Sequence, residues 1–248
     1  MRRSTPGCTP VAQEQQRLLR LLQQLDPLEV AKVARALEPF VTTERAARLR
    51  GVFAARLDAV TVVLDSPHDP HNGAAVLRSC DAFGLQRLHV VERLERFLAS
   101  NTVARGSERW VEMRTWSTPA EVIGALGASG HELVAAHAGG ELMPGDLREV
   151  PRLALVLGNE RHGIHPEILG ACARSVSVPM RGFAESLNLS VTAAILLQHA
   201  TGDRRGDLPE EEQQRLYARA LVLTVPHAPE ILEARGVKIP ELGVVQPL

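Results

Sequence analysis

Short runs of apolar, often β-branched residues alternate with helix-forming stretches from residue 59 to about residue 201. Two of the runs, Ala59–Leu64 (AVTVVL) and Leu153–Leu157 (LALVL), are unbroken, as expected of strands that are buried on both faces. Because strands that alternate with helices favour parallel pairing, the sequence predicts an α/β fold with a mostly parallel sheet and helices on both faces. Further strands are expected at Leu88–Val91, Trp110–Met113, Leu133–Ala136 and Val176–Val178.

Helical patterns flank this alternating region on both sides. Three helices are expected before it and two after the polar linker TGDRRGDLP; they span Val11–Leu25, Asp26–Leu37, Glu44–Leu57, Pro209–Leu223 and Pro226–Arg235. We therefore divide the chain into a helical N-terminal extension at 1–58, an α/β domain at 59–201 and a helical C-terminal extension at 202–248.

Composition restricts the possible partners. The net charge is −1 and only 3% of the residues are aromatic, which argues against a nucleic-acid platform of stacked aromatic rings. Any RNA surface must then be a local patch. The helix expected at 44–57 is rich in arginine, and Arg45, Arg48 and Arg56 could bind RNA phosphates because arginine pairs bidentately with phosphate. The alternative is an ordinary solvated helix face.

Several common chemistries lack their motifs. The three cysteines have no metal-ligand spacing and no HExxH sequence occurs, so we expect no metal site. The three-glycine dinucleotide fingerprint and the P-loop are missing as well. No apolar run approaches membrane-spanning length and no secretory segment is recognisable, so we expect a cytoplasmic protein without a membrane partner.

Three segments combine polar side chains with places where ligands commonly bind. In the first, Asn72 is expected at the N-cap of a helix, and Arg78 interrupts an apolar stretch. A partly buried arginine there would need an anionic partner. In the second, the strand LALVL ends at Gly158–Gly163, where Glu160 is either the partner of Arg78, an orienter of substrate, or a turn glutamate in water.

The third segment is Val176–Thr201, where a short strand is followed by a loop and the most apolar helix of the chain. Ser186 and Asn188 precede this helix and could simply cap it. With Glu185 beside them and Met180 before them, the loop could also hold a ligand that has apolar and polar parts.

Together, the sequences NGAAVLRSCDAFG, LVLGNERHGI and VPMRGFAESLNLSVTAAILL resemble the three ordered motifs of the SpoU (SPOUT) family of RNA 2′-O-ribose methyltransferases. The resemblance covers residues 61–200. The flanking sequences HDPHN, GSERWV and LPEEEQQRLY are most similar to the branch that methylates a guanosine ribose in the D-loop of tRNA. The same chemistry on ribosomal RNA is the nearest alternative, and a catalytically silent knotted RNA-binding protein is an alternative of another class.

The resemblance implies a C-terminal deep trefoil knot formed by residues 153–199, a homodimer, and S-adenosylmethionine as cofactor. It implies Arg78 as the main catalytic residue. Asn72, Glu160, Ser186 and Asn188 would support it. The family's backbone contacts to the cofactor correspond to Ala136, Val178 and Leu187, with Gly158 and Met180 lining the site. Relatives often carry Thr where this chain has Ala136, so only a backbone contact is expected there.

Overall fold

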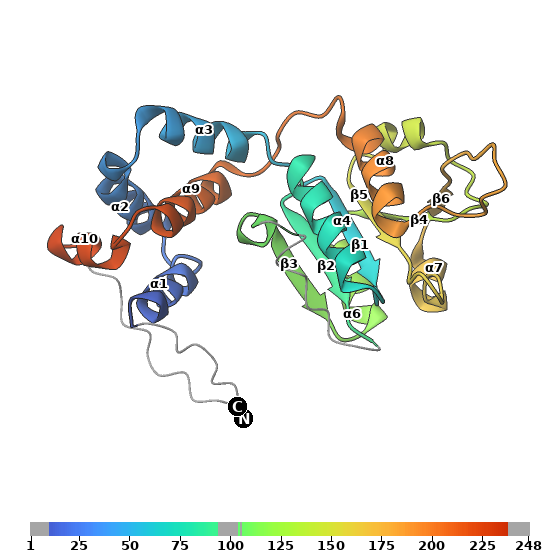
Figure 1. Cartoon of the computed structure of the whole chain (residues 1–248), viewed down its shortest axis with the longest axis horizontal. Helices are drawn as coiled ribbons and strands as arrows, with labels where there is room; N and C mark the ends of the chain where they lie inside the picture. Colours follow the sequence, from blue (N-terminus) through green and yellow to red (C-terminus); the bar gives the residue numbers. More distant parts are fainter. Residues whose placement is uncertain (1–9, 94–103, 105, 238–248) are drawn as a thin grey trace. The chain divides into compact units, whose positions relative to one another are not determined.

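The computed structural model describes residues 10–93, 104 and 106–237, apart from the side chains of residues 10–13 (Figure 1). The chain forms two compact units. One consists of Met1–Ala54 together with Leu208–Leu248, and the other is Ala55–Asp207. None of the helices among the described residues is long and apolar enough to cross a membrane.

A six-stranded sheet forms the centre of the 55–207 unit. Its strands are β1 (Val60–Asp65), β2 (Arg87–Val91), β3 (Glu112–Trp116), β4 (Glu132–Ala136), β5 (Leu153–Leu157) and β6 (Arg174–Val176). They lie in the order β3-β2-β1-β5-β4-β6, and every neighbouring pair is parallel. The predicted α/β class with a parallel sheet is therefore confirmed.

Two strands, β3 and β6, differ from their predicted ranges by two residues or more. β3 begins at Glu112 rather than Trp110, because the N–H groups of Trp110 and Val111 bond back to the Ser107 carbonyl in the 3₁₀ turn η2 (Ser107–Arg109). β6 ends at Val176, because the Ser177 N–H bonds to the Leu142 carbonyl instead of β4. In both cases the backbone donors are already used elsewhere and cannot extend the ladder.

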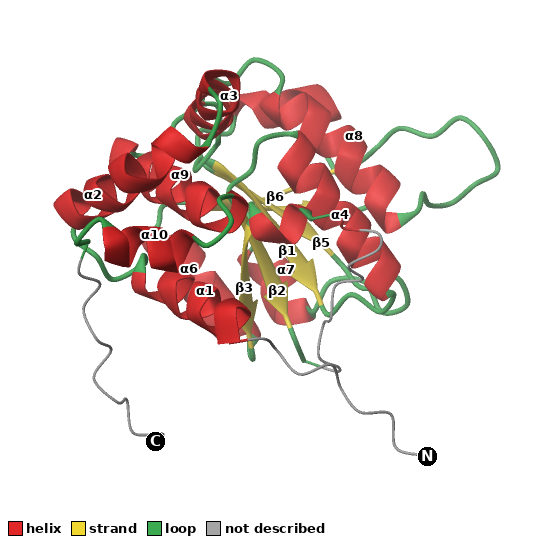
Figure 2. Cartoon of the chain, turned by 60° about the vertical axis from the view of Figure 1, so that its left-hand side comes forward, coloured by secondary structure: helices red, strands yellow, loops and turns green. Residues whose placement is uncertain are grey.

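Helices cover both faces of the sheet (Figure 2). On one face, α4 (Pro70–Ala82) and α8 (Leu189–Thr201) pack with Val62 and Leu64, while α6 (Pro119–Ala128) and α7 (Pro166–Ala171) pack with Val63 on the other. Successive strand residues point to opposite faces, so an unbroken apolar run such as VTVVL is what a doubly covered strand requires. The 3₁₀ helix η3 (Pro144–Glu149) packs against α8.

The strand order places β1 and β5 next to each other at the centre of the sheet. From β1 the chain proceeds outward to β2 and β3, and the strands on the other side of β5 are β4 and β6. Ligands of open α/β sheets bind at the carboxyl ends of strands where the order reverses in this way. The turn after β1 and the loop after β5 are therefore the first place to look for a site.

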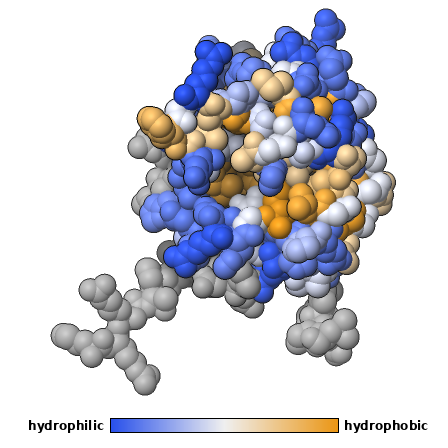
Figure 3. Space-filling model, turned by 90° about the vertical axis from the view of Figure 1, so that its right-hand side faces the viewer, coloured by the Kyte–Doolittle hydropathy of each residue, from blue (hydrophilic) through white to orange (hydrophobic). Residues whose placement is uncertain are grey.

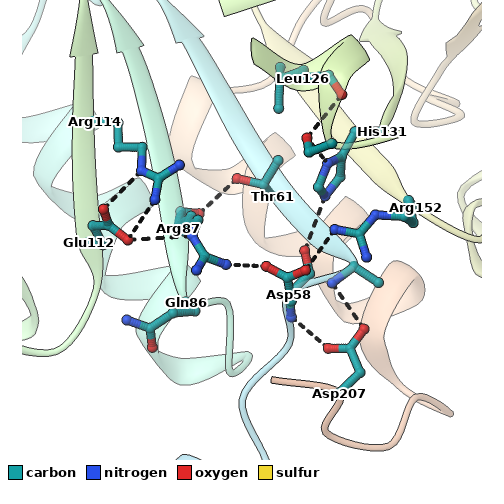
Figure 4. A network of polar contacts seen from close by, with 12 residues as sticks. Asp58, Thr61, Gln86, Arg87, Glu112, Arg114, Leu126, His131, Arg152 and Asp207 are labelled. Carbon is teal, nitrogen blue, oxygen red and sulfur yellow. Dashed lines mark hydrogen bonds and ion pairs between the residues drawn. The ribbon is translucent and has the colours of Figure 1, made fainter. Parts of the chain in front are cut away.

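At the opposite end of β1, Asp58 joins several basic side chains (Figure 4). Its carboxylate pairs with Arg87 and, at 2.6 Å, with Arg152 Nη2. Burial opposes ionisation of Asp58, but the hydrogen bond from Arg152 and the charge of Arg87 outweigh it and lower its pKa. The Asp207 carboxylate accepts the N–H groups of Asp58 at 2.5 Å and Ala59 at 3.0 Å, which ties together the two ends of this unit.

The other unit is helical and uses both ends of the chain. It contains α1 (Pro10–Leu21), α2 (Pro27–Leu37), η1 (Glu38–Phe40), α3 (Thr43–Ala54), α9 (Glu210–Thr224) and α10 (Ala228–Ala234). α9 packs against α2 and α3, and Val33, Phe53 and Leu221 are buried. Arg215 of α9 donates to the carbonyls of Leu22 and Leu25 at 2.9 and 2.7 Å and so satisfies two acceptors of the turn between α1 and α2.

Candidate active site

A cavity of about 700 Å³ opens at the carboxyl ends of β4, β5 and β6. The strand ends Ala136, Leu157 and Val176 form part of its wall. Four of the five predicted catalytic residues and all five predicted cofactor residues line this one cavity: Asn72, Glu160, Ser186 and Asn188, and Ala136, Gly158, Val178, Met180 and Leu187. Residues from three distant motifs therefore meet at one site, although Arg78 is not part of the wall.

Three of these side chains form a continuous hydrogen-bonded chain. Asn188 Nδ2 donates to Asn72 Oδ1 at 3.0 Å, and Asn72 Nδ2 donates to Glu160 Oε1 at 2.9 Å. The second carboxylate oxygen of Glu160 accepts the His68 N–H at 2.9 Å. The chain connects the start of α8, the first turn of α4 and the loop after β5.

Hydrogen bonds keep the Glu160 carboxylate ionised. Burial alone would raise its pKa, but the amide of Asn72 and the N–H of His68 stabilise the charged form, and the net effect lowers the pKa of Glu160. Glu160 is therefore a fixed acceptor that orients the Asn72 amide. Of the three roles considered for Glu160, pairing with Arg78 is not found: its oxygens accept from the His68 N–H and the Asn72 amide.

The predicted N-cap role of Asn72 is also wrong. α4 begins at Pro70, and the Asp69 carboxylate caps it by accepting the His71 N–H at 2.8 Å. Asn72 therefore lies in the first turn, where its side chain is available to Glu160 and Asn188. Asn188 is the N-cap of α8, one of the roles considered for it; its Oδ1 accepts the Ser190 N–H at 2.8 Å and its Nδ2 donates to Asn72.

Arg78 is exposed, contrary to the expectation that it is partly buried. The buried side of α4 is formed by Ala74, Leu77 and Cys80, which leaves position 78 on the outer side of the helix. Within the described part of the chain Arg78 has no ion pair or hydrogen bond. Its guanidinium is therefore open to an anion from outside the protein.

Arg56 cannot serve as the RNA contact predicted for it. Its side chain is 2% exposed, forms an ion pair with Asp81 and donates to the Leu85 carbonyl at 2.9 Å. The cause is that α3 ends at Ala54, so the helical periodicity used for the prediction does not extend to residue 56. Arg45 and Arg48 do lie on α3 and are exposed.

Several cavity residues were not singled out from the sequence. They include His137, which directly follows β4, Asn159 in the loop after β5, and Thr192 of α8. The positions of His137 and Asn159 directly after strands are a signal that could have found them. Within the described ranges, no group of three or more His, Cys, Asp and Glu side chains is arranged to hold a metal ion.

Large apolar side chains are exposed beside the cavity. Met180, Phe183 and Leu187 belong to the loop before α8, Val191 to α8 and Leu169 to α7, and Phe183 is fully exposed. Figure 3 views the molecule from this side and shows hydrophobic residues gathered around a hollow. Exposed apolar surface beside a cavity is typical of an interaction site.

Comparison with known proteins gives the class. Residues 59–198 match the SpoU rRNA Methylase family, and the chain belongs to this family. Among its relatives is the tRNA (guanosine(18)-2′-O)-methyltransferase of Escherichia coli K12, which is 32% identical over 184 residues that cover 69% of this chain and 80% of the relative.

Solved structures give the same result. The TrmH/SpoU tRNA modifying enzyme of A. aeolicus has a TM-score of 0.66 at 29% identity, covering 74% of this chain and 98% of that one. The SpoU methyltransferase AviRb from Streptomyces viridochromogenes, solved in complex with AdoMet, has a TM-score of 0.55 at 28% identity, covering 60% and 62%.

Proposed function

We propose that the protein transfers a methyl group from S-adenosylmethionine to the 2′-hydroxyl of a guanosine ribose in tRNA, and that its target is guanosine 18 of the D-loop. The observation that carries this proposal is the meeting of the three motifs at one cavity, with Asn72, Glu160 and Asn188 joined by hydrogen bonds. The names of the similar enzymes support the choice of tRNA as substrate.

The cavity suits S-adenosylmethionine in size and chemistry. Its volume of about 700 Å³ lies within the range of small-molecule sites. Leu157, Val178 and Leu187 offer an apolar wall for the adenine ring of S-adenosylmethionine. Glu185 and Thr192 offer polar groups for the ammonium and the ribose hydroxyls of the cofactor. When bound, the cofactor supplies an electrophilic methyl group on a sulfonium.

The wall also contains a loop that only glycine permits. A Cβ at Gly158 would lie 2.5 Å from the Gly163 carbonyl carbon and 2.6 Å from the Ile164 nitrogen. The loop after β5 therefore folds back on itself at this point, and Gly158 lets it do so next to the cofactor space.

The other site side chains position the RNA. Arg78 binds an RNA phosphate near the target nucleotide, because its guanidinium is exposed and arginine pairs bidentately with phosphate. Asn72, Ser186 and Asn188 orient the ribose with hydrogen bonds, and Glu160 fixes the orientation of Asn72. Holding the hydroxyl, the methyl group and the sulfur in line can supply much of the barrier reduction.

RNA also contacts the helical unit in this proposal. Arg45 and Arg48 are exposed three residues apart on α3 and hold tRNA phosphates. Arg50 of the same helix is already engaged, with Glu38 at 2.6 Å and above the Tyr217 ring at 4.3 Å.

The proposal includes two further family features. One is a deep trefoil knot within residues 153–199, supported by the position of β6 beyond β4 and by the backbone bonds of Leu142 with Ser175 and Ser177. The other is a homodimer, supported by the exposed apolar side chains Met180, Phe183, Leu187 and Val191 beside the cavity.

The decisive experiment is to map the methylated nucleotide. The full-length protein is incubated with labelled S-adenosylmethionine and either unmodified tRNA or unmodified ribosomal RNA. Label on the 2′-oxygen of the D-loop guanosine is the expected result. Label in ribosomal RNA alone would show that the substrate is ribosomal RNA and not tRNA. Binding of both RNAs without methyl transfer would favour a catalytically silent RNA-binding protein.

A further inference from the structure

The turn after β1 is fastened by a fully buried carboxylate. Asp65, the last residue of β1, has no exposed surface, and its two oxygens have different partners. Oδ1 accepts from Arg93 Nε at 3.0 Å and Nη2 at 2.9 Å, while Oδ2 accepts the His165 N–H at 2.6 Å. Because Arg93 follows β2 and His165 ends the loop after β5, one carboxylate connects three segments at the carboxyl edge of the sheet.

The next residue has an unusual backbone conformation. Ser66 has a φ of +48°, a left-handed value that is uncommon for a residue other than glycine. Its N–H bonds to the Val91 carbonyl at 2.9 Å, its Oγ to the same carbonyl at 3.1 Å, and its own carbonyl accepts from Asn159 Nδ2. A strained residue persists only where its surroundings hold it, and here they do.

Asn159 in turn organises the loop that carries Glu160. It is 6% exposed, and its Oδ1 accepts the N–H groups of Arg161 at 2.8 Å and His162 at 3.1 Å. Its backbone also exchanges two bonds of 2.9 Å with Gly163. The loop is thus wound around one buried amide, and that amide is tied to the turn after β1.

We propose that Asp65 is a positioning residue for methyl transfer: it fixes the turn after β1 against the loop after β5 and thereby holds Glu160 toward Asn72. This inference rests on the proposed function. Asp65 acts through Ser66 and Asn159 on one side of the turn and through His165 on the other. Asp65 itself does not line the cavity. Misplacement of a catalytic constellation by about 1 Å can cost about 100-fold in rate, so such a tie has kinetic consequences.

The test compares the two ends of the same strand. Asp65→Asn removes the charge at the carboxyl end of β1, and Asp58→Asn is the matched control, because Asp58 stands just before β1 and also pairs with arginines. Each substitution is made alone and together with Glu160→Gln in the full chain. Melting temperature, S-adenosylmethionine affinity by calorimetry and the single-turnover rate on unmodified tRNA are measured for all variants.

We expect Asp65→Asn to lower the single-turnover rate by about 10-fold to 100-fold. The double variant with Glu160→Gln should be no slower than the slower single variant, because both changes disable the same group. Asp58→Asn should lower the melting temperature without changing the rate. The proposal is overturned if the effects of Asp65→Asn and Glu160→Gln multiply, or if Asp58→Asn slows transfer as much as Asp65→Asn.

Two further measurements separate failure of the positioning role from misfolding of the variant and from failure of the proposed function. If Asp65→Asn does not fold, Arg93→Lys keeps the positive charge but loses the two-pronged donor, and wild-type behaviour of this variant would overturn the proposal. If wild-type protein methylates none of the RNAs, the proposed function fails. In that case the coupling between Asp65 and Glu160 is measured by the S-adenosylmethionine affinities of the two single variants and the double variant. If the losses of binding free energy in the single variants add up in the double variant, Asp65 does not position Glu160.

Discussion

Asn188 and Asn72 are 116 residues apart in the chain, yet Asn188 Nδ2 donates to Asn72 Oδ1 at 3.0 Å. The hydrogen bonds on either side run in the same direction. Ser190 N–H donates to Asn188, Asn188 to Asn72, and Asn72 to Glu160. Each side-chain amide accepts with its oxygen and donates with its nitrogen. The orientation of both amides therefore follows from the negative charge of Glu160, the last acceptor in this series of hydrogen bonds.

Arg78→Ala should abolish methyl transfer and leave cofactor affinity nearly unchanged. The guanidinium is exposed on the outer side of α4 and is not part of the cavity wall, so its loss removes an RNA contact and not a cofactor contact. The measurement is the single-turnover rate beside S-adenosylmethionine affinity. Arg205→Ala, which changes another exposed arginine, is the control, and a near-normal rate for Arg78→Ala would remove Arg78 from the mechanism.

Arg45→Ala and Arg48→Ala should each make tRNA binding less dependent on salt. Each lost phosphate contact reduces the slope of log K against log salt by roughly one unit. The measurement is a series of binding titrations between low and moderate salt. Arg50→Ala is the comparison, because Arg50 is already paired with Glu38 and stacked over Tyr217. If the slopes of both variants equal that of the wild type, Arg45 and Arg48 do not contact RNA and α3 has an ordinary solvated face.

Arg56→Ala should destabilise the α/β unit by about 3 kcal/mol, since it leaves the Asp81 carboxylate and the Leu85 carbonyl without their buried partner. Denaturant unfolding of the purified protein measures this. At temperatures where the variant is folded, the salt dependence of tRNA binding should equal that of the wild type. A flatter slope would mean that Arg56 does contact RNA.

Glu160→Gln should lower the melting temperature by a few degrees at most at neutral pH. The pKa of Glu160 is lowered from about 4.5, so its ionised form favours the folded state. That contribution is complete above about pH 4.5 and is lost as pH falls through the lower folded-state value. The difference between wild type and variant should therefore shrink as melting is measured from pH 7 down to roughly pH 3. A difference that grows in acid would contradict the assignment.

Gly158→Ala should weaken S-adenosylmethionine binding by about 10-fold or more, because the added Cβ meets backbone atoms of Gly163 and Ile164 that form the cavity wall. Calorimetry gives the affinity. Gly127→Ala in α6 is the matched control: nothing lies within 4 Å of its Cβ position, so this variant should gain up to about 1 kcal/mol of stability and bind the cofactor normally.

Local patterns predicted most elements well where one physical signal dominated. LALVL became β5 without a shift, because all five residues are buried between two helical layers. Asn188 was recognised as a possible cap and is one. The start of α4 was misplaced even though Asp69-Pro70 carries the same cap and first-turn proline as Asp26-Pro27. The start of α4 at Pro70 therefore does have a local signal in the sequence.

The errors at Arg78 and Arg56 have a different origin. The prediction for Arg78 rested on the apolar stretch that it interrupts, and the prediction for Arg56 rested on a helix extended to Leu57. Which side chains are covered depends instead on which elements pack against a helix and on where the helix ends. Position 78 lies on the uncovered side of α4, and residue 56 lies beyond the end of α3. The order β3-β2-β1-β5-β4-β6, which brings the three motifs together, has no local signature at all.

The helical unit draws α1, α2 and α3 from the start of the chain and α9 and α10 from its end. The buried faces of α2 and α3 are covered by α9, and the Leu22 and Leu25 carbonyls are satisfied by Arg215. Removal of the helices at either end would therefore expose the apolar faces of the helices from the other end, so neither truncation should yield a shorter stable protein. Any attempt to isolate the 55–207 unit has to cut the chain twice.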